Sequence, residues 1–196
     1  AIGLGVAAAL LVVAVMLAGG EQLGGSEFGE PTIAGEALPT VLDFVPVDAS
    51  QDPAFGTTIP SVSGQDFDGS TVEIAAGDAP IAILFVSHSC PHCQDEIPEI
   101  QSWLNAGGGV PGVEIVTVST AANSAAANWP PSAWLESEGW QPPVIADDAD
   151  SSVFRAFGGR VIPYWVFVDG NGIVTRRNPG RMEIPALQAA MAETIR

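Results

Sequence analysis

Stretches of apolar residues alternate with polar turns along most of the chain. The run Ile81–Val86 is short, continuous and apolar, which is typical of a buried strand. Polar, Gly-containing turns at residues 66–69 and 169–172 each lie between two strand-like runs and indicate β-hairpins. The predicted strands cover residues 61–65, 71–74, 81–86, 113–118, 144–145, 164–168 and 173–176. The predicted helices cover residues 91–105, 151–157 and 183–195.

Residues 119–141 interrupt this alternation. They are rich in Ala, Asn, Pro and Trp, and we expect short helices within an insertion. Strands that alternate with helices, followed by a hairpin and a terminal helix, predict a mixed α/β sandwich.

The first twenty residues, 1–20, are apolar and carry no charge. Twenty helical residues, at about 1.5 Å each, span a hydrocarbon core of about 30 Å. A signal-peptide core is usually only about 7–15 residues long. We therefore expect an uncleaved transmembrane anchor, with a cleaved signal peptide as the alternative.

The formal net charge is −17, and the chain contains six arginines and no lysine. Residues 21–60 include acidic residues but no basic one, which is typical of the translocated flank of an anchor. We expect a single-pass protein of the cell membrane with an extracytoplasmic, oxidising-side domain. The acidity argues against a nucleic-acid partner. We interpret residues 21–58 as an acidic, mostly irregular tether and residues 59–196 as the domain.

Both cysteines lie in the segment Ser89-Cys90-Pro91-His92-Cys93, where the predicted strand gives way to a helix. The first turn of a helix offers free N–H groups and the positive end of the dipole, and both stabilise a thiolate at Cys90. Pro91 fits this turn because its missing N–H costs nothing there. Cys93 lies one turn deeper, close enough to attack a mixed disulfide on Cys90. The spacing predicts reversible dithiol–disulfide chemistry.

Two other interpretations of this segment compete with redox chemistry. A structural disulfide would close a very small loop and stabilise the fold little. A metal site could use His88, Cys90, His92 and Cys93, but structural zinc usually takes ligand pairs from two separate segments. The main alternative function is therefore a copper-binding module that uses His88, Cys90 and Cys93 to deliver copper to an exported metalloenzyme.

With these motifs, residues 59–196 resemble thioredoxin-fold proteins, and more narrowly the membrane-anchored TlpA/ResA-like thiol–disulfide oxidoreductases. Pro98 stands where these proteins carry a helix-kinking proline, and Phe157–Pro163 resembles the segment that ends in their cis-proline. The Pro-His pair between the cysteines is typical of the oxidising DsbA-like proteins. The resemblance implies an α/β, thioredoxin-like three-layer sandwich with an N-terminal β-hairpin and an insertion, preceded by a transmembrane helix.

Several residues beside the two cysteines are candidates for the site. Glu96 lies one turn after Cys93 on the same helix face, and the resemblance implies that it shuttles a proton to the buried thiol. A cis Pro163 would expose the backbone of Ile162 to a substrate peptide. His92 would favour the Cys90 thiolate. The alternatives are a solvated Glu96, a trans Pro163 and a His92 that faces solvent.

These expectations combine into one functional hypothesis. We expect the protein to be an anchored, extracytoplasmic thiol–disulfide oxidoreductase that uses no cofactor and no metal. Its partners are exported proteins that contain cysteines and a membrane redox partner that recycles the cysteine pair. The residues leave the redox direction open, with a slight preference for oxidation because of the Pro-His pair.

Overall fold

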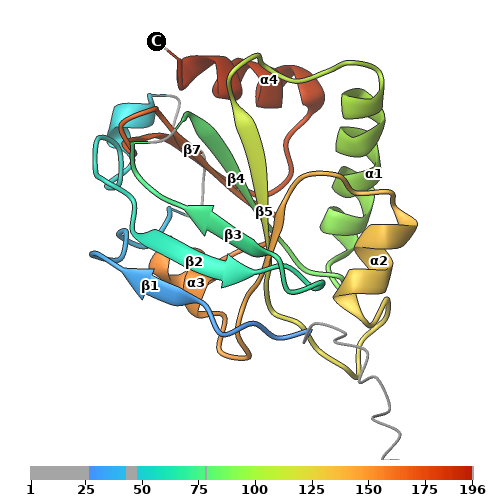
Figure 1. Ribbon diagram of the computed structural model, residues 1–196. Helices are drawn as coiled ribbons and strands as arrows, with labels where there is room; N and C mark the ends of the chain where they lie inside the picture. Colours follow the sequence, from blue (N-terminus) through green and yellow to red (C-terminus); the bar gives the residue numbers. More distant parts are fainter. Residues whose placement is uncertain (1–26, 43–47, 78, 196) are drawn as a thin grey trace, which may run out of the picture.

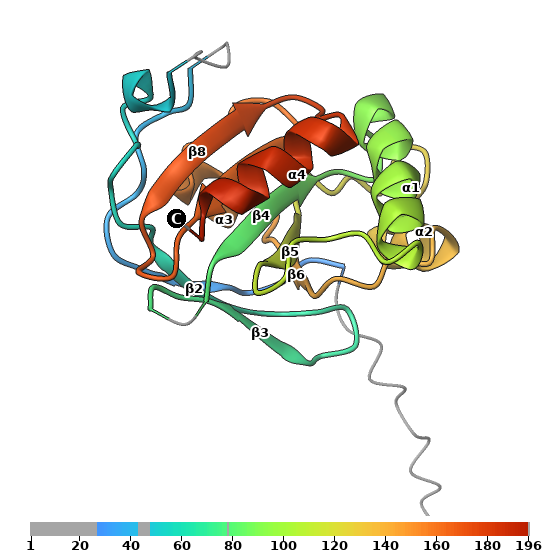
Figure 2. The same cartoon turned by 90° about the horizontal axis from the view of Figure 1, so that it is seen from above.

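The computed structural model describes residues 27–42, 48–77 and 79–195. A five-stranded sheet with the order β6-β5-β4-β7-β8 forms the centre of the molecule (Figure 1 and Figure 2). β4, β5 and β6 run parallel, whereas β7 and β8 pair in antiparallel fashion. The strands are β4 (Ile81–Val86), β5 (Glu114–Ser119), β6 (Val144–Ala146), β7 (Tyr164–Val168) and β8 (Val174–Pro179).

Two layers cover the two faces of this sheet. Every residue of β4 is buried, because alternate residues face opposite cores. Ile81, Ile83 and Phe85 belong to one core, and Ala82, Leu84 and Val86 belong to the other. Helices lie over the second face (Figure 2): α1 (Pro91–Asn105), α2 (Pro131–Ser137) and α4 (Ile184–Glu193). The first face carries α3 (Ser152–Ala156) and a small antiparallel sheet of β1 (Thr32–Ala34), β2 (Ser61–Gln65) and β3 (Thr71–Ile74).

This arrangement confirms the predicted mixed α/β, thioredoxin-like fold with its N-terminal hairpin. β5 covers residues 114–119 rather than 113–118, and the rest of the insertion contains a single helix, α2, between turns and irregular segments. β1 and the short 3-10 helix η1 (Ala49–Gln51) were not predicted.

Within the described residues, no helix is both long enough and apolar enough to span a bilayer. The predicted anchor at residues 1–20 lies outside the described residues.

The segment predicted to be a tether is mostly irregular, but it is not separate from the domain. β1 pairs with β2, and Leu38 and Val41 are buried in the core. The Leu38 N–H donates to Ala156 O (2.8 Å) and the Val41 N–H donates to Gly158 O (2.8 Å). A domain boundary at residue 59 would remove these contacts. The apolar residues of this segment were too few and too scattered to predict that they are buried.

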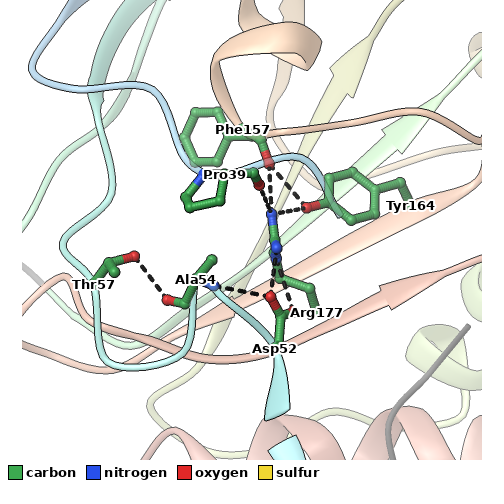
Figure 3. A network of polar contacts seen from close by, with 7 residues as sticks. All are labelled: Pro39, Asp52, Ala54, Thr57, Phe157, Tyr164 and Arg177. Carbon is green, nitrogen blue, oxygen red and sulfur yellow. Dashed lines mark hydrogen bonds and ion pairs between the residues drawn. The ribbon is translucent and has the colours of Figure 1, made fainter. Parts of the chain in front are cut away.

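A buried ion pair fixes the same segment to β8 (Figure 3). The Arg177 side chain is fully buried, its Nε donates to Asp52 Oδ2 (2.9 Å), and a second nitrogen, Nη2, donates to Asp52 Oδ1. Its Nη1 donates to Pro39 O (2.6 Å) and to the Tyr164 hydroxyl (3.3 Å). The Tyr164 hydroxyl in turn donates to Phe157 O (2.9 Å). Loss of one partner of such a pair costs about 3–5 kcal/mol, so Asp52 belongs to the folded unit.

The first described residues dock on the insertion. The Glu27 carboxylate accepts hydrogen bonds from the Ser132 N–H (3.0 Å) and hydroxyl (2.6 Å) at the start of α2. The Phe28 ring packs against Trp129, with ring centres 6.0 Å apart. Trp129 also contacts the ring of His88, two residues before Cys90. The N-terminal segment therefore reaches the loop that supports the cysteine motif.

Candidate active site

Cys90 occupies the N-cap position of α1, directly after the turn that follows β4. Its backbone is extended (φ −83°, ψ 117°), and its carbonyl accepts the N–H groups of Cys93 and Gln94 (both 3.1 Å). Pro91 supplies the first helical residue, as its fixed φ favours. Both cysteines are free thiols; Cys90 is half-buried and Cys93 is fully buried. The helix therefore presents one sulfur to solvent and keeps the other beneath its first turn.

The segment before β7, which ends in Ile162 and Pro163, contacts the Cys90 thiol. The Ile162–Pro163 peptide bond is cis, as the sequence predicted. The Cys90 Sγ donates to the carbonyl oxygen of Ile162 at 3.3 Å. Val161, the residue before Ile162, is one of three large apolar side chains that are exposed among the described residues. A polypeptide that reaches Cys90 would therefore meet the backbone of Ile162.

Burial governs the chemistry of Cys93. Its side chain lies in the core beside Ile97 and Leu84, and loss of hydration raises the pKa of the Cys93 thiol far above its usual range. The negative charge of Glu96 adds to this effect. Cys93 is therefore held as a thiol until a base removes its proton.

Glu96 is the candidate for that base, because its charge acts on the Cys93 thiol. Its side chain is 1% exposed, and Oε1 accepts hydrogen bonds from Trp165 Nε1 (3.1 Å) and from the Met182 N–H (2.8 Å). Burial raises the pKa of Glu96 to about 7, although these two hydrogen bonds and the charge of Arg181 oppose the rise. The alternative of a solvated helix carboxylate is therefore wrong. A carboxyl group with this pKa accepts and releases protons near neutral pH.

The two histidines of the motif lie in opposite environments. His92 is exposed, and it has no hydrogen bond or ion pair with any residue that the structure describes. This placement is the solvent-facing alternative considered for it. His88 is fully buried; its Nδ1 is 2.7 Å from Ala127 O, and its Nε2 accepts the Asn123 N–H (3.1 Å). Nδ1 must then carry the proton, and His88 braces the insertion.

The copper-site alternative gains no support from this geometry. Both ring nitrogens of His88 are already hydrogen bonded, so neither has a lone pair directed at the cysteines. Among the described residues, no group of three or more His, Cys, Asp and Glu side chains is arranged to hold a metal ion.

The sequence profile of the AhpC/TSA family matches residues 55–177, which is more than half of the chain. The protein belongs to the AhpC/TSA family. No curated protein sequence is significantly similar to it.

Solved structures similar to this AhpC/TSA-family protein share its thioredoxin-like fold. The thioredoxin domain of a thiol-disulfide oxidoreductase from Bacteroides vulgatus is 20% identical, with a TM-score of 0.58 over 73% of this chain and 99% of that one. StoA from Bacillus subtilis is 18% identical, with a TM-score of 0.55 over 66% and 95% of the two chains. The dsbF protein of MTB is 25% identical, with a TM-score of 0.55 over 68% and 94%.

Three residues of this family member that contact or influence Glu96 were not predicted. The indole N–H of Trp165 donates a hydrogen bond to the carboxylate, and Met182 and Arg181 lie in the loop that follows β8. A tryptophan in a buried strand needs a partner for its N–H, and this requirement is the signal that could have revealed the first contact. The effects of Met182 and Arg181 could not be predicted, because they depend on how the loop after β8 folds back toward Glu96.

Proposed function

We propose that this protein is a thiol–disulfide oxidoreductase that exchanges disulfides with protein substrates through Cys90 and Cys93. The observation that carries the proposal is the position of the Cys90 sulfur, half-buried at a helix N-terminus and 3.3 Å from Ile162 O. Cys93 and Glu96 lie buried behind it. The structurally similar thioredoxin domain from Bacteroides vulgatus also belongs to a thiol-disulfide oxidoreductase.

In the reductive direction, the Cys90 thiolate attacks one sulfur of a substrate disulfide. The substrate S–S bond breaks, a mixed disulfide forms, and the released substrate sulfur takes a proton from water. Cys93 gives its proton to the Glu96 carboxylate and attacks the Cys90 sulfur, which releases the second substrate thiol. The substrate gains two electrons, and the protein's dithiol becomes a disulfide.

Every step is reversible, so the direction depends on the reduction potential of the cysteine pair relative to that of its partner. Ile162 and Pro163 form the surface on which the substrate peptide binds. The Ile162 backbone lies beside the reacting sulfur, where an extended peptide can pair with it. Glu96 accepts the proton of Cys93 or returns it. Its pKa of about 7 suits proton transfer in both directions.

The finer assignment is to the TlpA/ResA-like, membrane-anchored branch. The buried Glu96 behind Cys93 and the N-terminal hairpin support it. The charge-free residues 1–20 and the acidic flank support an extracytoplasmic domain. The partners are then exported proteins with cysteines and a membrane redox protein that recycles the pair.

Insulin reduction tests the activity. The wild-type protein should reduce insulin with dithiothreitol as the electron source, with and without a chelator. Cys90→Ser should lose the activity, whereas Cys93→Ser should accumulate mixed disulfides visible on a non-reducing gel. If Cys90→Ser is as active as wild type, the proposed function is wrong. Activity that depends on added copper would favour the metal module instead.

A further inference from the structure

Two buried polar atoms near the active site lack a hydrogen-bond partner among the described residues. One is Oε2 of Glu96, and the other is Nε of Arg181. The first is an acceptor and the second is a donor, so their requirements are complementary. An unpaired buried polar group costs about 1–3 kcal/mol, and native proteins rarely leave one without protein or water.

The backbone brings Arg181 close to Glu96. Arg181 immediately precedes Met182, whose N–H donates to the other oxygen of the same carboxylate at 2.8 Å. The Arg181 charge acts on Glu96 and favours its ionised form. No direct ion pair joins the two within the described part of the chain, where Arg181 instead pairs with Glu99 and, at 3.9 Å, with Glu183.

The guanidinium therefore has an inner and an outer side. Its outer nitrogen, Nη2, meets Glu99, whose side chain is 48% exposed, while its inner nitrogen, Nε, is buried. The charged or titratable groups that act on Glu96 are Cys93 and Glu99 of α1 and Arg181 of the loop after β8. From β7, the Trp165 indole donates a hydrogen bond but carries no charge.

We propose that Arg181 is a positioning residue for the proton transfer at Glu96, and that one water molecule links Arg181 Nε to Glu96 Oε2. The guanidinium keeps the carboxylate in the charged form that accepts the Cys93 proton. The water gives both buried atoms a hydrogen-bond partner and holds the free carboxylate oxygen in place. This role rests on the proposed function, because it serves the resolving step of disulfide exchange.

The test measures the pKa of Glu96 in the full reduced chain in detergent. The probe is the side-chain carboxyl carbon of 13C-labelled glutamate, with the Glu96 signal assigned by its absence in Glu96→Gln. Arg181→Met removes the charge and keeps an apolar stem, and it should raise the pKa by about one unit. The fraction of charged Glu96 at pH 7 should then fall about fivefold.

Glu99→Gln separates electrostatics from loop structure. It breaks the same ion pair as Arg181→Met, but it removes a negative charge that opposes ionisation of Glu96. The pKa of Glu96 should therefore fall in Glu99→Gln and rise in Arg181→Met. A purely structural role for the ion pair predicts changes in the same direction, and that result would overturn the proposal. Arg181→Lys, which retains the charge, should keep most of the wild-type value.

Arg176→Met is the matched control. Arg176 lies on β8 and is paired with Glu193 at 2.9 Å, with a similar exposure of 22%. Its removal should leave the pKa of Glu96 unchanged. If Arg181→Met and Arg176→Met give the same value, Arg181 has no such role. The titration needs no substrate, so it distinguishes failure of this inference from failure of insulin reduction in the wild type.

Discussion

Replacement of Glu96 by Gln should change how the stability of the protein depends on pH. The pKa of Glu96 rises from about 4.5 to about 7 on folding, mainly because the carboxyl group is buried. Each pKa unit corresponds to about 1.4 kcal/mol, so the rise is worth about 3 kcal/mol. The folded state binds the proton more tightly than the unfolded state. Glu96 therefore contributes most stability below pH 4.5, and this contribution is lost as the pH rises through about 7.

Gln cannot ionise, so the variant should not lose this contribution. We expect wild type to lose about 3 kcal/mol more than Glu96→Gln between pH 4.5 and pH 8. The comparison cancels Asp147, a second buried carboxyl group whose pKa burial also raises, because both proteins contain it.

Urea unfolding of reduced chains that begin at residue 27, extrapolated linearly at each pH, measures the difference. Glu73→Gln, at an exposed position on β3, is the control and should follow wild type. Parallel pH profiles for wild type and Glu96→Gln would show that Glu96 titrates normally, and the proton-transfer role would lose its basis.

Three further results are expected. Iodoacetamide should modify the half-buried Cys90 before the buried Cys93, as mass spectrometry of the native protein can show; earlier modification of Cys93 would reverse their roles. Asp52→Ala should lower the free energy of unfolding by about 3–5 kcal/mol, because it leaves a buried guanidinium unpaired. In the same urea assay, Glu193→Gln at the partly exposed pair should cost at most about 1 kcal/mol, and equal costs would contradict this reasoning. His92→Ala should lower the reduction potential by tens of millivolts at most, because the ring is exposed to solvent in the first turn of α1 and a charge there is worth little; a glutathione titration would show any larger change.

Local patterns in the sequence predicted most of the fold. The two hairpins depend on Asp-Gly and Asn-Gly turns that lie within a few residues of the strands they join, and β4 is recognisable because all its residues are apolar. The same reasoning could not place Asp52 beside Arg177, because 125 residues separate them and either side chain alone is typical of a protein surface. β1 has only three residues, and its pairing depends on the free edge of β2.

The candidate site shows the same division between local and distant contacts. The cysteine spacing is local, and it predicted a thiolate at Cys90 and a second sulfur one turn deeper at Cys93. The environment of Glu96 depends on distant segments, since Trp165 and Met182 lie 69 and 86 residues away in sequence. Sequence alone therefore indicated a possible base but not the burial that gives it a pKa near neutrality.

The loop after β8 contacts both the peptide segment that faces the substrate and the proposed proton acceptor, Glu96. The Gly180 N–H donates to Pro163 O at 2.8 Å, and Met182, two residues later, donates to Glu96 at the same distance. Gly180 has a φ of +91°, a conformation that side chains with a Cβ rarely adopt, and Asn178 Nδ2 donates to its carbonyl at 2.9 Å. The loop thus fixes the substrate-facing backbone and the proton acceptor relative to each other. A shift of this loop would change both the approach to Cys90 and the ionisation of Glu96.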